Sequence, residues 1–147
     1  MSLGPFDVVP VIERIRANCP QFRKVEGAAE LASIDKQGNE VVPAAYVVLA
    51  QEQPRAKTGG TLRVIQDVVV SFAVILVIRQ YRVADLGTAA SNAFRPLIAA
   101  VREAVVGWRP DDYHAATELG EGRLLRYSDT TLTWNQVFRT SYQARSN

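Results

Sequence analysis

Apolar residues recur along this chain with two different periods, one typical of helices and the other of strands. Between residues 7 and 18 they return at spacings of three and four, which predicts a helix with Asp7 as its N-cap. A longer, alanine-rich stripe with the same spacing predicts the main helix over Leu86–Val106, ended by Gly107. A short helix is also expected over Ala28–Ile34. The chain therefore offers one long and two shorter helices, and the apolar face of each needs a covering surface.

The remaining apolar segments have the two-residue period or the β-branched composition of strands. Six strands are predicted, over Phe22–Glu26, Ala44–Gln51, Leu62–Tyr81, Thr117–Leu119, Arg123–Tyr127 and Leu132–Gln143. Gly120–Gly122 has the composition of a tight hairpin turn, and a bulge is expected near Ser71. The pattern predicts one α+β domain over residues 1–147, with helices packed on a mainly antiparallel or mixed sheet. Residues 1–5 and 144–147 are expected to fray.

The second half of the longest predicted strand is apolar on both of its faces. Even-numbered side chains point one way and odd-numbered ones the other: Phe72, Val74, Leu76 and Ile78 against Ala73, Ile75 and Val77. An antiparallel strand with one face in water should alternate between apolar and polar residues. Either helices of the same chain cover both faces, or another subunit covers one of them. The four even-numbered residues are the candidate subunit-interface strand.

Composition narrows the class of protein. A hydrophobic fraction of 48% with 22% charged residues is typical of a folded domain. The 17 Lys and Arg residues are interleaved with 15 Asp and Glu, so the net charge of +2 forms no concentrated basic patch of the kind that nucleic-acid binders have. The single cysteine, Cys19, excludes an intrachain disulfide and is expected to be a buried thiol. The longest apolar run, Val68–Ile78, has about half the length that a transmembrane helix needs, so no contact with a membrane is expected.

Residues that could carry chemistry are few. His114 is the only histidine, and Asp111 and Asp112 beside it belong to a segment expected to be an exposed loop. A metal site would need several carboxylates, and no acidic cluster has suitable spacing. In Lys57–Thr61 the lysine precedes the glycines and a strand follows, whereas a phosphate-binding loop has the reverse order and a helix. We therefore expect neither an enzyme nor a metal or cofactor site.

The polar stretch between the second and third predicted strands is the first candidate for a partner contact. Turn-forming residues dominate it, and loops of this length are often functional. Arg55 and Lys57 supply positive charge for phosphate or for an acidic protein surface. The candidate contact residues are Pro54, Arg55, Lys57, Thr58, Gly59 and Gly60.

Four segments carry a family likeness by their order and spacing. The first is Phe6-Asp7-x-x-Pro10-Val11-Ile12-Glu13-Arg14-Ile15 with Cys19-Pro20, and the second is Phe22–Leu31 followed by Pro43–Val47. The third is Arg95-Pro96-Leu97 leading to Val106–Pro110, and the fourth is Gly122–Leu125 with Trp134, Phe138, Arg139 and Thr140. Together they resemble the phage tail terminator proteins, over most of the chain and in the right order. None of the segments encodes a reaction.

The resemblance implies a structural role at the head–tail junction of a virion. Tail terminators form a ring, typically of six subunits, on the head-proximal end of the tail tube. The ring stops tube polymerisation and presents the surface to which the head's connector attaches. The implied partners are copies of the chain itself, the tail tube protein and the connector protein, with at most non-specific contact to DNA in the lumen. Assembly is implied to take place in the host cytoplasm, and the family supplies no catalytic residues.

Two interpretations from other classes stay open. A head-completion or neck protein of the same junction would share the size and the α+β composition, and would bind the connector rather than the tube. A small-molecule-binding domain would need a deep apolar cleft with converging polar groups. Nothing in the sequence points to such a cleft.

Overall fold

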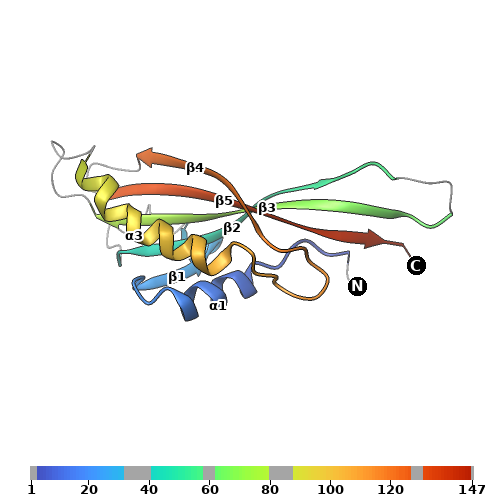
Figure 1. Ribbon diagram of the computed structural model, residues 1–147, viewed down its shortest axis with the longest axis horizontal. Helices are drawn as coiled ribbons and strands as arrows, with labels where there is room; N and C mark the ends of the chain where they lie inside the picture. The colour runs from blue at the N-terminus through green and yellow to red at the C-terminus, as the bar shows by residue number, and fades with distance from the viewer. Residues whose placement is uncertain (1–2, 32–40, 58–61, 80–87, 127–130, 147) are drawn as a thin grey trace.

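The computed structural model describes residues 3–31, 41–57, 62–79, 88–126 and 131–146. Five strands form one sheet in the order β1-β2-β3-β5-β4 (Figure 1). Their bounds are Lys24–Gly27 (β1), Ala44–Pro54 (β2), Ile65–Arg79 (β3), Glu118–Arg126 (β4) and Thr131–Arg145 (β5). β1 runs parallel to β2 and the other neighbours are antiparallel. The predicted α+β domain with a mixed sheet is thereby confirmed.

Two helices, α1 (Val9–Asn18) and α3 (Thr88–Val105), lie against each other on one face of the sheet, which we call the inner face (Figure 1). Arg14 joins them, because its Nε donates a hydrogen bond of 2.8 Å to the carbonyl of Ala104. Its guanidinium also lies 5.7 Å from the ring centre of Trp108, in cation–π contact. The side chains that α1, α3 and the inner face bury together form the main hydrophobic core.

The ends of both helices lie close to those predicted. The N-cap of α1 is Val8 rather than Asp7, although the Asp7 carboxylate accepts a hydrogen bond from the Val9 amide at 3.0 Å. Gly107 follows α3 with φ of 82°, the left-handed conformation that glycine adopts readily after a helix. A third helical segment begins at residue 28, as predicted, and residues 32–40 lie outside the described part of the chain. Asp85, which the sequence predicts as the N-cap of the main helix, also lies outside it.

Both faces of the second half of β3 are covered by the chain itself. Phe72, Val74 and Leu76 are 0% exposed and belong to the core under the helices. On the opposite face, which we call the outer face, Val77 packs with Ala44 and Tyr46, and with partly buried residues before β2. The helices α1 and α3 thus cover the inner face, and residues before β2 contribute to the cover of the outer face.

Beyond the helices, the sheet continues as a narrow three-stranded projection, which we call the arm (Figure 1). It consists of residues 51–57, 62–70 and 140–146, from the end of β2, the start of β3 and the end of β5. The C-terminal part of β5 is held in it: Ala144 pairs with Gln66, and Val64 and Ser146 exchange hydrogen bonds of 2.8 and 2.9 Å. β3 thereby provides residues 144–146, which the sequence predicts to fray, with a partner strand.

The segment Gly120–Gly122 is not a hairpin turn, and this prediction is wrong. β4 passes through it as one strand, with a shift of register against β5 between Leu119 and Gly122. A Cβ on Gly122 would lie 2.6 Å from Cζ2 of Trp134, so glycine is needed there for close approach rather than for a turn. The bulge expected near Ser71 in β3 lies instead in the facing strand β2, between Leu49 and Gln51.

Among the described residues, no helix has both the length and the apolar character needed to cross a lipid bilayer.

Candidate partner-contact surface

The candidate contact loop begins as part of the arm. Pro54 is the last residue of β2 and pairs with Val68. Arg55 continues the hairpin, because its amide donates to the Asp67 carbonyl at 2.8 Å and its own carbonyl accepts from Gln66 Nε2 at 2.8 Å. Arg55 and Lys57 are exposed at the end of the arm. Thr58, Gly59 and Gly60, the other candidate residues, lie outside the described residues.

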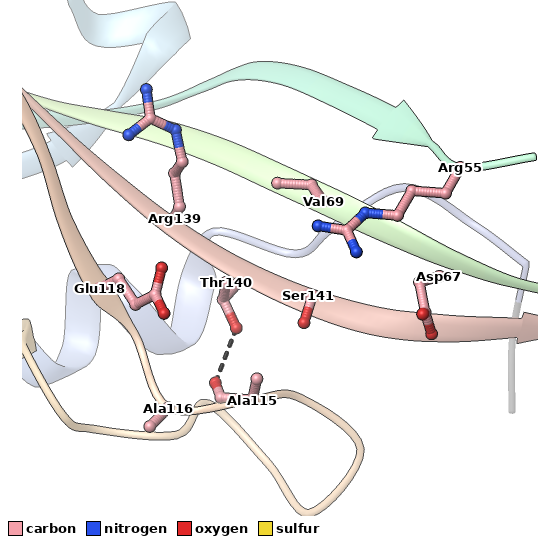
Figure 2. A pocket seen from close by; sticks show the side chains of 9 residues that line it. All are labelled: Arg55, Asp67, Val69, Ala115, Ala116, Glu118, Arg139, Thr140 and Ser141. Carbon is pink, nitrogen blue, oxygen red and sulfur yellow. Dashed lines mark hydrogen bonds between the residues drawn. The ribbon is translucent and has the colours of Figure 1, made fainter.

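A groove of about 380 Å³ lies where the arm joins the body of the sheet (Figure 2). We call it the charged groove; it is lined by Arg55, Asp67, Val69, Ala115, Ala116, Glu118, Arg139, Thr140 and Ser141. Figure 2 shows Arg55 reaching from the end of β2 over β3 towards Val69. The hydroxyl of Thr140 donates a hydrogen bond of 2.7 Å to the Ala115 carbonyl, which fixes the segment before β4 beside the groove.

The charged groove carries both signs of charge. Arg55 and Arg139 supply two cations, and Asp67 and Glu118 supply two anions. Arg139 is already engaged, since its Nη2 lies 3.6 Å from an Oε1 of Glu121. An open groove with charges of both signs suits a polar contact with another protein surface better than the enclosure of a small molecule.

The candidate subunit-interface strand lies elsewhere, inside the core. The exposed fractions of Phe72, Val74, Leu76 and Ile78 are 0%, 0%, 0% and 6%. These side chains lie under α1 and α3, so no neighbouring subunit can contact them while the helices are in place. Burial within the chain therefore accounts for the apolar pattern that suggested an interface.

A second hollow, of about 330 Å³, lies on the other side of the base of the arm. We call it the aromatic pocket; its lining is Gly4, Pro5, Phe6, Asp7, Asp111, Tyr113, His114 and Tyr142. Phe6 anchors it to the core by stacking on Phe72 at 5.4 Å between ring centres. The His114 ring lies 5.4 Å from the rings of both Phe6 and Tyr142, so three aromatic rings pack together.

Hydrogen bonds and charges fix the polar groups around the aromatic pocket. Nδ1 of His114 lies 2.7 Å from Oδ1 of Asp111. Partial burial acts to raise the pKa of Asp111, but the hydrogen bonds and charge from His114 and the Tyr113 amide outweigh it and leave that pKa below its usual value. The pKa of Tyr142 is raised by burial and by the negative charge of Glu52, which accepts the hydrogen bond of its hydroxyl at 3.3 Å.

The segment around His114 is less open than the sequence suggested. Asp111 and Asp112 are exposed as expected, but the His114 side chain is only 16% exposed. Arg109 closes the loop by donating to the carbonyls of His114 and Asp112, at 2.8 and 2.7 Å. Within the described ranges, no three residues among His, Cys, Asp and Glu gather as metal ligands would.

Sequence reasoning missed the aromatic pocket, because its parts come from the two ends of the chain and from the segment before β4. Tyr142 lies in the strand predicted over Leu132–Gln143, but nothing in that segment indicates that Phe6 and His114 pack beside it. The isolated bridge between His114 and Tyr142 brings these segments together.

The structure is thus a single α+β domain whose sheet carries helices on its inner face and extends into an arm with two hollows at its base. The chain belongs to the phage tail terminator protein family, whose family model matches residues 1–147. It is thereby a structural protein of the phage tail, and the family resemblance expected from the sequence is confirmed. A search of curated proteins finds no match.

The fold also has a solved counterpart. A chain from a structure titled "Virion of native gene transfer agent (GTA) particle" superposes with a TM-score of 0.57 at 16% identity. The alignment covers 92% of this chain and 95% of the other. At this level of identity the likeness concerns the fold.

Proposed function

We propose that copies of this chain form a ring, most simply of six subunits, that caps the head-proximal end of the tail tube. The ring stops polymerisation of the tube protein and offers its other side to the connector of the head. The observation that carries this proposal is the match of the tail terminator family over the whole chain, residues 1–147. The place of action is the head–tail junction, after assembly in the host cytoplasm.

The shape of the subunit is suited to a ring. Contacts within a closed ring of more than two copies are heterologous, so each subunit needs two different surfaces that fit each other. The arm and the helix-covered body are two such surfaces, and the arm projects clear of the helices (Figure 1). The scattered charge supports only loose contact with DNA that passes through the lumen.

The direct test uses tail tubes assembled without a terminator. Adding the wild-type protein should stop further growth, so that negative-stain images show tubes of unchanged length with a density on one end. Deleting Lys57–Gly60 should leave the fold intact by circular dichroism and abolish capping, because it shortens the arm beyond the paired residues Pro54 and Val68.

Growth of tubes to the same length with and without the wild-type protein would contradict the proposal. If the protein also bound isolated connector rings, that result would assign it to head completion instead. Unchanged capping by the deletion variant would leave the proposed ring standing but show that the end of the arm makes no contact needed for capping.

A further inference from the structure

We infer that the arm tip of one copy docks in the aromatic pocket of a second copy, with Leu62 as the inserted side chain. This inference rests on the proposed function, because it names the contact by which copies join into a ring. It supplies the two surfaces that the ring requires and assigns residues to each.

The first observation is an exposed apolar group at the end of the arm. Leu62, in the connection between β2 and β3, is 104% exposed, so its whole side chain is in water. Val64 and Ile65 beside it are 38% and 39% exposed. Scattered single apolar residues are normal on a surface, but a cluster at the tip of a projection is typical of a contact site.

The second observation is a receptor of matching character. The aromatic pocket has a volume of about 330 Å³, and Phe6, Tyr113, His114 and Tyr142 contribute rings to its lining. Tyr113 is 67% exposed at its rim. Contacts in which an aliphatic side chain enters a pocket of aromatic rings are a common centre of binding energy in protein interfaces.

The third observation is opposite charge around the two surfaces. Four basic residues and one acidic residue lie exposed at the end of the arm: Arg55, Lys57, Arg63 and Arg145, with Asp67. Around the pocket three exposed acidic residues outnumber one basic residue: Asp7, Asp111 and Asp112, with Arg109. The Glu52 carboxylate, which accepts hydrogen bonds from the Phe6 amide and the Tyr142 hydroxyl, adds a negative charge behind the pocket. Such complementarity steers association and fixes orientation.

The tip cannot occupy the pocket of its own chain. β3 and β5 are paired along the arm, with Ile65 opposite Arg145 and Val68 opposite Tyr142. The paired strands hold Leu62 at the far end of the arm, just before the start of β3, while Tyr142 belongs to the pocket at the base of the arm. An arm tip that enters the pocket must therefore belong to another copy, and its basic residues complement the acidic residues around the pocket.

The two surfaces also explain why the contact would propagate. A tip that meets a pocket leaves the partner's own tip and the first chain's pocket open for further copies, which is the heterologous pattern that closes into rings. A contact of tip with tip would bring two basic groups together and stop at a two-fold dimer.

The experiment is disulfide trapping between variants that each carry one new surface cysteine, with the buried native Cys19 replaced by alanine in all of them. L62C and Y113C are mixed under mild oxidation, at concentrations where native mass spectrometry detects rings of the wild type, or on capped tubes if rings form only there. The mixture should give a cross-linked dimer in high yield, whereas each variant alone should not. L119C, at a 47% exposed position on the edge strand β4, is the matched control in place of L62C and should not cross-link to Y113C.

A second pair of variants tests the charges and the apolar contact separately. L62D should weaken association of copies at least about 30-fold, the effect expected of a central interface residue, while leaving the circular dichroism of the chain unchanged. R63D should also weaken association, and adding D112R to it should restore at least part of the loss.

The outcomes separate this inference from the proposed function. Rings or capped tubes in which L62C and Y113C do not cross-link, and which L62D leaves intact, would overturn the inference and retain the function. Trapping of L62C with itself, or with the tube or connector protein, would also overturn it. If the wild type forms no ring and caps no tube, the proposed function fails and the inference with it.

Discussion

Arg102 on α3 donates two hydrogen bonds to the side-chain oxygen of Gln136 on β5, from Nε at 3.2 Å and from Nη2 at 2.9 Å. Gln136 is 0% exposed. Its Nε2 faces the carbonyls of Gly120 and Glu121 at 3.2 and 3.3 Å, inside the bulge of β4. One buried amide therefore links the long helix, the strand β5 and the edge strand β4.

Replacing Gln136 with Leu should lower the free energy of unfolding by about 2–4 kcal/mol. The substitution leaves the Arg102 guanidinium and three strand carbonyls without the partner that the fully buried Gln136 side chain provides. Urea denaturation followed by circular dichroism measures the change. The control is Gln53→Leu on the exposed end of β2, for which we expect a change below about 0.5 kcal/mol. Equal stability of the Gln136 variant and the control would contradict the structural role of the amide.

Gly122→Ala should destabilise the fold by about 1–3 kcal/mol, since the new methyl group would meet Trp134 and come within 3.0 Å of the Gln136 side-chain oxygen. Gly27→Ala is the matched control, because the nearest atoms to its new methyl group lie at 3.7 Å, an ordinary contact distance. Thermal denaturation of the two variants should separate them clearly. Similar midpoints would show that β4 can shift to accommodate the methyl group.

The stability of the protein should decline at alkaline pH in a way that depends on Tyr142. Its pKa is raised in the folded state by burial and by Glu52, so the folded protein holds the phenol proton more tightly than the unfolded chain. This contribution is complete below the ordinary tyrosine pKa of about 10 and is lost as the pH rises through the folded-state pKa. The free energy of unfolding, measured by urea denaturation at a series of pH values, should therefore fall more steeply with pH for the wild type than for Tyr142→Phe above about pH 10.

Glu52→Gln isolates the electrostatic part of the same effect. Removing the carboxylate charge should lower the pKa of Tyr142, which NMR of the Tyr142 ring signals measures directly. A pKa that rises or stays the same in the variant would show that Glu52 does not act on this phenol.

The thiol of Cys19 should react slowly in the native protein. Cys19 is 1% exposed, and burial raises its pKa, with Arg14 acting in the opposite direction and Glu103 adding to the increase. Labelling with a thiol-specific disulfide reagent at neutral pH should be slow without denaturant and complete within the mixing time in strong denaturant. Rapid labelling of the native protein would mean that α1 opens readily from the sheet.

Features that depend on neighbouring residues could be predicted from the sequence. The helix expected over residues 7–18 is observed as Val9–Asn18, and that expected over Leu86–Val106 as Thr88–Val105. Periodic apolar stripes and a glycine after the helix are encoded within one segment, so they need no knowledge of the rest of the fold. The long strands and the α+β class follow from the same kind of pattern.

Features that depend on distant residues could not be predicted. Gly120-Glu121-Gly122 has the composition of a turn, and its role as a bulge depends on Gln136 and Trp134 in another strand. In the same way, the apolar residues around Phe72 look alike in sequence whether helices or another subunit cover them. The aromatic pocket joins three segments that are far apart in the sequence, so no local pattern predicts it.

The pairing of β3 with β5 runs without a register shift from Ile65 opposite Arg145 to Arg79 opposite Thr131. The same two strands therefore form the centre of the body and the centre of the arm, with no hinge between them. The projection acts as a stiff spacer rather than a tether, so its tip keeps a set distance and direction from the helices. In the ring proposed above, a spacer of this kind would lose little conformational freedom when its tip binds, and it would fix the angle between neighbours, the geometric quantity that determines how many copies close a ring.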